Sequence, residues 1–224
     1  MMHLGRIFHK MDITNMINNY IRKRPGMYLG SNSITPLIHF LNGYQAAKRE
    51  LGICSQELFP LPFRYMREFT SIRLNCHNNL DWRKHILWFC DGDEEKALNK
   101  FFELYDEFCQ IRMKRYWKAV LSENNIQWNN SMKGASRRWW PDGREPIFSD
   151  PIAVYVIELT FPAYILAVET VNDIRLEPQF FTSAEMAKSR GPIPFGAETY
   201  FGKIDQWKEF SAEDITFDKA IDWS

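Results

Sequence analysis

The sequence predicts an α+β protein, because helical patterns fill its first half and strand patterns dominate much of the second. Apolar residues recur at helical spacing in the middle of the chain. Two β-rich runs, "AVYVIEL" and "YILAVETV", follow later and are separated by Phe161 and Pro162. We therefore expect one domain over 1–224, helical in its N-terminal half, followed by a small, mainly antiparallel sheet. The alternative is a subdivision into a helical part, 1–120, and a sheet-rich part, 150–224.

The first predicted helix begins near Asp12 or Thr14, since either side chain can cap a helix through its oxygen. Pro25 disfavours helical geometry at the residue before it, so we expect the helix to end there. Thr35 and Pro36 fit the N-cap and N1 positions of a second helix.

The middle of the chain contains one ambiguous segment and one clear helix. Residues 63–76 fit either a helix or a strand, and their aromatic and β-branched content favours a strand. Asp91 is the predicted cap of a longer helix, whose first turn is acidic and therefore complements the helix dipole. Its apolar face continues to Arg112, and an extension to Trp117 also fits the pattern.

Residues 121–150 are polar and rich in Gly, Asn and Ser, which is typical of a break between structured parts. Beyond the two β-rich runs, "DIRLEPQFF" predicts a third strand. Residues 182–185, "TSAE", fit a capping box, so a short helix should follow through Lys188.

The charge balance argues against a dedicated nucleic-acid binder, because 28 basic and 28 acidic residues give a net charge of zero. The charges are segregated, however: residues 1–25 are mainly basic, whereas 91–107 and 198–222 are mainly acidic. Such blocks are usually solvated faces, but they can also present an acidic patch to a basic partner. The candidate partner-binding acids are Asp93, Glu94, Glu103, Asp106 and Glu107.

The N-terminal sequence lacks the apolar core of a secretory signal, because charged residues interrupt it repeatedly. No uninterrupted run of about 18 apolar residues predicts a membrane span. The 4 cysteines are sparse and form no Cys-x-x-Cys pair. We therefore expect a reduced, cytoplasmic protein without a membrane partner.

The most distinctive motif is "IRKRPGMYLGSNSI", residues 21–34. The gyrase-type ATPases carry a similar Arg-Pro-Gly-Met-Tyr string, but that family also needs an acid-and-asparagine helix and an Asp-x-Gly-x-Gly turn. Neither follows here, and no Gly-rich loop could cradle a phosphate, so we expect no bound nucleotide. The motif is interpreted as a structural turn in which Arg24 and Tyr28 position the next helix. Its residues are Arg24, Pro25, Gly26, Met27, Tyr28 and Gly30.

Residues 20–52, "YIRKRPGMYLGSNSITPLIHFLNGYQAAKRELG", resemble the N-terminus of a family of small bacterial proteins. In that family an Arg-Pro-Gly-Met-Tyr-Leu-Gly turn precedes a Ser-Ile pair and a Phe-Leu-x-Gly-Tyr helix, and some members are immunity proteins paired with polymorphic or contact-dependent toxins. The resemblance implies a cytosolic, non-enzymatic protein that binds and blocks one toxin domain, often a nuclease. The neutral charge argues against this, since inhibitors of basic nucleases are often strongly acidic.

A second conspicuous patch is "SRRWWPDGRE", residues 136–145. Its candidate partner-binding residues are Arg137, Arg138, Trp139 and Trp140. They could anchor a protein partner, stack on nucleic-acid bases, or fold back onto the core. Nucleic acid is the disfavoured partner, because one short basic patch on a neutral chain provides little electrostatic attraction.

Cys76, His77, His85 and Cys90 lie close together in the sequence but match no zinc-ligand spacing, so we expect no metal and no cofactor. A cysteine nucleophile would need a histidine and an orienting carboxylate or amide brought together by the fold. The alternatives to a toxin-binding protein are therefore an enzyme with an unrecognised active site, or a nucleic-acid-binding protein that uses the Arg137–Trp140 loop.

Overall fold

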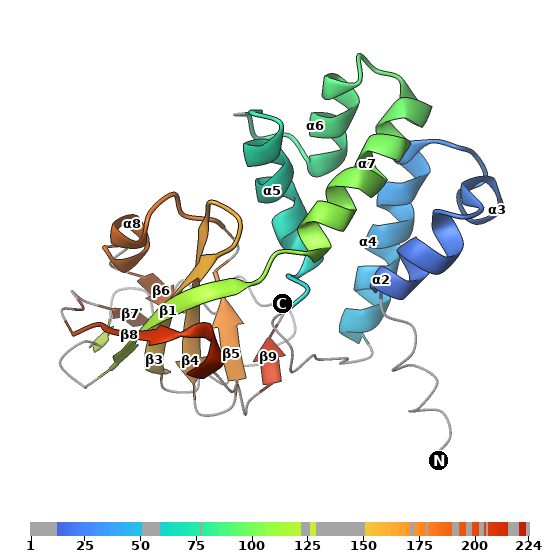
Figure 1. The fold of residues 1–224 in the computed structure, drawn as a ribbon. Coiled ribbons are helices and arrows are strands. Elements are labelled where there is room, and N and C mark those ends of the chain that lie inside the picture. The colour runs from blue at the N-terminus through green and yellow to red at the C-terminus, as the bar shows by residue number, and fades with distance from the viewer. Residues whose placement is uncertain are drawn as a thin grey trace, which may run out of the picture. The chain divides into compact units, whose positions relative to one another are not determined.

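The computed structural model of the chain describes residues 13–50, 59–76, 78–121, 126–128, 151–170, 173–177, 179–189, 193–195, 199–201, 204, 206–214 and 220–222. The contacts within the chain divide it into two compact units (Figure 1). Unit 1 comprises residues 1–53 and 66–110, and unit 2 comprises residues 54–65 and 111–224. Helices form unit 1 and strands form most of unit 2, so the predicted α+β class is confirmed.

Unit 1 is built around one long helix, α7, which contacts α4, α5 and α6. A π-helical turn, η1, separates the first two α-helices. The elements are α2 (Ile13–Met16), η1 (Ile17–Ile21), α3 (Pro25–Leu29), α4 (Ile34–Glu50), α5 (Met66–Arg73), α6 (Trp82–Phe89) and α7 (Glu94–Cys109).

The core of unit 1 is rich in aromatic rings because α7 presents one continuous apolar stripe to its neighbours. Phe101, Tyr105 and Phe108 are buried on that stripe at the spacing of successive helical turns. The Phe101 ring lies 5.0 Å from that of Trp82, and the Phe108 ring lies 5.5 Å from that of Phe69. These ring contacts join α7 to α6 and α5.

Two predictions about the middle of the chain are wrong. Residues 63–76 form a 3-10 turn, η2 (Phe63–Tyr65), followed by α5, rather than a strand. Met66, Phe69 and Thr70 lie three and four positions apart and are all buried, so packing on one helical side outweighs the local β-propensity. Helix α7 ends at Cys109 and does not reach Trp117, because that residue belongs to a strand of unit 2.

Unit 2 contains a 6-stranded sheet in the order β8-β1-β3-β4-β5-β9 and a 3-stranded sheet in the order β2-β7-β6. Neighbouring strands are antiparallel except β5 and β9, which are parallel. The elements are β1 (Met113–Val120), β2 (Ile126–Trp128), β3 (Pro151–Leu159), β4 (Tyr164–Thr170), β5 (Asp173–Leu176), α8 (Ala184–Lys188), β6 (Ile193–Phe195), β7 (Thr199–Phe201), β8 (Lys208–Ser211), η6 (Ala212–Asp214) and β9 (Ala220–Asp222).

The predicted β-rich runs are confirmed as the antiparallel strands β3 and β4, and the predicted third strand as β5. The helix predicted from residues 182–185 is confirmed as α8, and the Ser183 side chain caps it by accepting a hydrogen bond from Met186 N. Helix α8 contacts β3 and β4, and Ala184 and Ala187 are buried against the same apolar cluster as Trp117.

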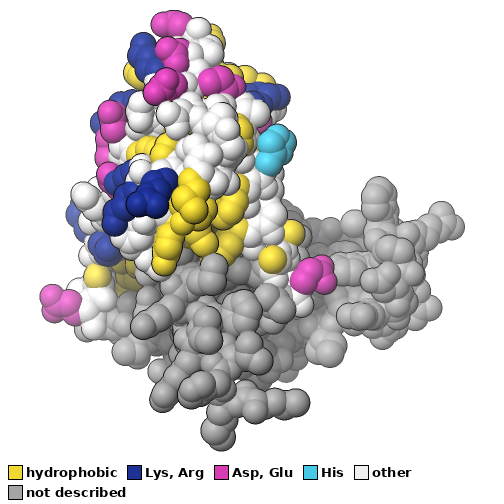
Figure 2. Space-filling view, turned by 90° about the vertical axis from the view of Figure 1, so that its right-hand side faces the viewer, with side chains coloured by type: hydrophobic (Ala, Val, Ile, Leu, Met, Phe, Trp, Pro, Cys, Tyr) yellow, Lys and Arg dark blue, Asp and Glu magenta, His cyan; other side chains and the backbone are white. Residues whose placement is uncertain are grey.

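One side of unit 1 exposes apolar side chains next to basic ones. Figure 2 shows this side, which lies at the right of Figure 1 and carries α2, α3 and α4. A central group of hydrophobic side chains has lysine and arginine side chains directly beside it, and acidic side chains lie toward the top of the same view (Figure 2). Of the helices that the structure describes, none combines the length and the apolar character needed to cross a membrane.

Candidate functional site

The turn between α6 and α7 reverses the chain within a few residues. The N–H of Cys90 caps the end of α6 by bonding to Ile86 O, and Gly92 N bonds back to Leu87 O. Asp91 and Gly92 both adopt left-handed backbone geometry, with φ of 56° and 81°. Asp91 was predicted to cap α7. This prediction is wrong, because Asp91 lies in the turn before the cap residue of α7.

Asp93 is the residue that caps α7. Its carboxylate accepts a hydrogen bond of 2.9 Å from Lys96 N, which satisfies one of the free N–H groups of the first turn. Asp93 is thereby fixed at the mouth of a depression formed by the end of α6 and the first turns of α7.

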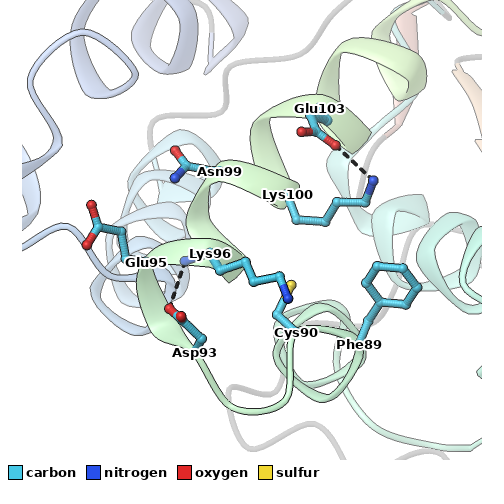
Figure 3. Close-up of a pocket in the computed structure, with 8 residues that line it drawn as sticks. All are labelled: Phe89, Cys90, Asp93, Glu95, Lys96, Asn99, Lys100 and Glu103. Atoms are coloured by element: carbon cyan, nitrogen blue, oxygen red, sulfur yellow. Dashed lines mark hydrogen bonds and ion pairs between the residues drawn. The ribbon is translucent and has the colours of Figure 1, made fainter.

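Figure 3 shows this depression, which is open to solvent and has a volume of about 510 Å³. Lys100 crosses it, donating to Glu103 at 2.8 Å, and its Nζ lies 5.7 Å from the centre of the Phe89 ring. The lining residues are Phe89, Cys90, Asp93, Glu95, Lys96, Asn99, Lys100 and Glu103.

The depression offers charges of both signs but no paired nucleophile and base among its lining residues. Burial raises the pKa of the Cys90 thiol, so the thiol stays protonated at neutral pH and is a poor nucleophile. His85 is buried elsewhere in unit 1: its Nδ1 lies 3.1 Å from Thr70 Oγ1, and its Nε2 lies 2.9 Å from Asn78 Oδ1. The arrangement therefore suits the binding of a charged surface better than covalent chemistry.

Helix α6 ends with two exposed aromatic residues, Trp88 and Phe89, and Phe89 lines the depression. Trp88 is 67% exposed and Phe89 is 52% exposed, which is unusual for residues of this size in a folded protein. The acidic residues Asp91, Asp93 and Glu95, also exposed, follow them around the turn. We call Trp88, Phe89, Asp91, Asp93 and Glu95 the Trp88 corner. Its aromatic residues, Trp88 and Phe89, were not among the predicted binding residues, although an aromatic pair directly before an acidic run is visible in the sequence.

The acidic residues predicted to form one patch are divided among different neighbours. Glu94 faces the start of α4, where it accepts hydrogen bonds from Ser33 Oγ at 2.5 Å, Thr35 Oγ1 at 2.6 Å and Thr35 N at 3.0 Å. Burial raises the pKa of this carboxyl, but these hydrogen bonds and the nearby Arg83 outweigh that effect and hold the pKa below its usual value. The Glu94 carboxylate is therefore occupied by hydrogen bonds within unit 1.

Asp106 and Glu107 are likewise paired within unit 1. Asp106 receives two hydrogen bonds from Arg22, at 2.7 and 3.0 Å, and Glu107 receives one of 2.7 Å from Arg73 Nε. Of the predicted acidic residues, only Asp93 and Glu103 line the depression. Around the start of α7, the exposed carboxylates that the structure describes are Asp91, Asp93 and Glu95, which belong to the Trp88 corner.

The Arg-Pro-Gly-Met-Tyr motif forms a short helix of its own. Pro25 occupies the start of α3, and Gly30 ends it in the left-handed conformation with φ of 78°. Arg24 and Tyr28 were expected to position the next helix, but both side chains are exposed, and Tyr28 packs edge-on against Tyr20. The start of α4 is instead held by Glu94, and α4 begins at Ile34, which makes Ser33 rather than Thr35 the residue that precedes it.

Arg137, Arg138, Trp139 and Trp140 lie outside the residues that the structure describes. His77, from the candidate metal cluster, also lies outside them. Within the described parts of the chain, no group of three or more His, Cys, Asp or Glu side chains is placed to hold a metal ion.

Comparison of the chain with protein-family models, with curated proteins and with solved structures found no match.

Proposed function

We propose that this chain is a non-catalytic protein-binding module of the immunity type, acting in the cytoplasm, which binds and blocks a toxin domain through the Trp88 corner. The observation that carries the proposal is the exposure of Trp88 and Phe89 beside three exposed carboxylates. The resemblance of residues 20–52 to immunity proteins supports the class of partner.

The corner combines the two chemistries that protein interfaces use. Tryptophan and phenylalanine bury a large apolar area when they bind a partner, and they lose little conformational entropy in doing so. Tryptophan is also enriched among the residues that contribute most to binding energy. Asp91 and Glu95 make no side-chain hydrogen bond or ion pair with any described residue. Their charge remains available to attract a basic surface, such as the substrate-binding cleft of a nuclease.

The mechanism would be steric and electrostatic. Carboxylates around the rim speed the encounter with a basic partner, and burial of the two aromatic rings slows dissociation. Blocking a nuclease cleft in this way needs no reaction by the chain itself.

The test is capture of a partner from the native host with three baits: the unchanged chain, Trp88→Ser and Val120→Ser. Val120 is a matched control, since it is 69% exposed on unit 2 and far from the corner in sequence. We expect one basic protein to be retained in stoichiometric amount by the unchanged chain and by Val120→Ser, and to be lost with Trp88→Ser.

The captured protein should then be purified and assayed for toxic activity, nuclease activity first, with and without the chain. Inhibition at a one-to-one ratio by the unchanged chain, but not by Trp88→Ser, is the expected result. Equal capture by all three baits, or a captured protein whose activity the chain does not inhibit, would contradict the proposal.

A further inference from the structure

A second exposed apolar surface of unit 1 lies on η1 and α3 and has basic neighbours in the sequence. Met27 is 70% exposed, Tyr20 45% and Tyr28 37%, and the two tyrosine rings contact each other edge-on at 6.0 Å. These side chains come from η1 and α3, on the side of unit 1 that Figure 2 presents. They form a platform of two rings and one flexible thioether, the side-chain types that adapt to a partner.

Two exposed basic residues, Lys23 and Arg24, lie between Tyr20 and Met27 in the sequence. The sequence contains no Asp or Glu between Ile13 and Arg49. Lys23 and Arg24 are exposed, and neither makes a side-chain hydrogen bond or ion pair with any other described residue. We call Tyr20, Lys23, Arg24, Met27 and Tyr28 the Met27 face.

The positive charge of Arg22, by contrast, is already paired. Its guanidinium binds Asp106 and donates to Phe102 O at 2.8 Å, so its charge is neutralised within unit 1. The exposed positive charge of the face therefore comes from Lys23 and Arg24.

The Trp88 corner is the chemical complement of the Met27 face. Both surfaces carry exposed aromatic or methionine side chains. The corner has three exposed carboxylates against Lys96 and Lys100, and Lys100 is paired with Glu103, so carboxylates outnumber unpaired cations there, whereas Lys23 and Arg24 make the Met27 face basic. Figure 1 shows α3 and the turn between α6 and α7 at separate places on unit 1, so one copy of the chain presents both surfaces at once. We propose that the Met27 face binds the Trp88 corner of a second copy of this chain.

Two general considerations support self-association. A chain with zero net charge, as here, experiences little long-range repulsion between copies, which favours association. Contacts between two different surfaces of identical chains either close into a symmetric assembly or continue as an open one. The self-association needs no toxin, but it uses the same corner as the proposed toxin contact, so a bound partner would displace the second copy.

The test uses the purified full-length chain alone, in sedimentation velocity over a range of concentrations. Met27→Glu places a negative charge on the Met27 face, and Trp88→Lys places a positive charge on the Trp88 corner. Each change removes a central apolar contact and adds repulsion, so each should weaken self-association by about tenfold or more. Val120→Lys, on unit 2, is the matched control and should associate like the unchanged chain.

The decisive sample is a mixture of the two variants. Met27→Glu retains an intact corner and Trp88→Lys retains an intact face, so the mixture should recover complexes that neither variant forms alone. Increasing the salt from about 0.05 to about 0.5 M should weaken these complexes, because the Debye length shortens severalfold. Arg24→Glu and Glu95→Lys, at exposed side chains, provide a second pair if either first variant loses its far-UV circular dichroism.

A monomeric unchanged chain at its highest soluble concentration would overturn the inference. So would association that both variants leave unchanged, or a mixture that recovers nothing. Because no other protein is present, such a failure leaves the capture of a toxin by the corner untouched, and failure of the capture experiment leaves this assay untouched.

Discussion

Thr35 and Glu94 lie 59 residues apart in the sequence, yet both the N–H and the hydroxyl of Thr35 donate to the Glu94 carboxylate. The first turn of a helix has N–H groups without partners inside the helix, and a carboxylate there also complements the helix dipole. Glu94 belongs to the first turn of α7, so one side chain joins the starts of two helices. This contact removes Glu94 from the acidic surface and positions the chain that follows the Arg-Pro-Gly-Met-Tyr motif.

We expect Glu94→Gln to lower the free energy of unfolding by about 1–2 kcal/mol, because hydrogen bonds to a charged acceptor become weaker bonds to an amide. Urea unfolding, followed by far-UV circular dichroism, measures this change. Glu95→Gln is the matched control, since Glu95 is exposed on the same turn and should change stability little. Equal losses for the two variants would contradict the role assigned to Glu94.

His85 should make stability depend on pH. Burial lowers the pKa of its imidazole in the folded protein below the ordinary value of about 6.5. The folded state therefore favours the neutral ring, which contacts Thr70 and Asn78. Its stabilising contribution is present above about pH 6.5 and is lost as the pH falls through the lowered folded pKa.

The measurement is urea unfolding at several pH values between about 5 and 7.5, together with an NMR titration of the imidazole. His85→Gln should remove the part of the pH dependence that belongs to this ring. An imidazole that titrates above the ordinary histidine value in the folded protein would refute the argument from burial.

Arg22 and Asp106 should be coupled more strongly than Arg73 and Glu107. Arg22 donates twice to Asp106, donates to Phe102 O, and lies 5.0 Å from the centre of the Phe102 ring. A lysine can reproduce only one of these contacts, because it lacks the planar fork of the guanidinium. We expect Arg22→Lys to reduce the free energy of unfolding by about 0.5–1 kcal/mol, a modest value because Asp106 is partly exposed.

Arg73→Lys provides the comparison, since Arg73 and Glu107 are both about half exposed and solvent screens their attraction. Thermal or urea unfolding of the two variants under the same salt conditions compares them directly. If Arg73→Lys were the more destabilising change, the contact to Phe102 would not contribute as argued.

Local sequence patterns were sufficient for several elements. β3 and β4 follow from their β-branched and aromatic runs, and α8 follows from the capping pattern before it. The apolar stripe of α7 was also predictable, because a period of 3.6 residues was sustained over several turns. Where the local signal was ambiguous, as in residues 63–76, packing against α6 and α7 favoured the helix α5.

The candidate site was only partly predictable. Asp93 and Glu103 were identified from the acidic run, and the structure places both at the depression. Trp88 and Phe89 were not identified: the aromatic pair before the acidic run is visible in the sequence, but aromatic residues are more often buried than exposed, and their exposure depends on the packing. Arg137–Trp140 remain a prediction from the sequence.

By itself, then, the sequence determined the α+β class, the short elements that caps and β-rich runs specify, and the block of acids that follows residue 90. Only the tertiary structure decided which of those acids remain available. Glu94 and Asp106 meet Thr35 and Arg22 across 59 and 84 residues of chain, and such pairings depend on how helices pack. The charge pattern along the chain gives the number of carboxylates, whereas the packing determines which of them pair with a neighbouring residue and which remain exposed.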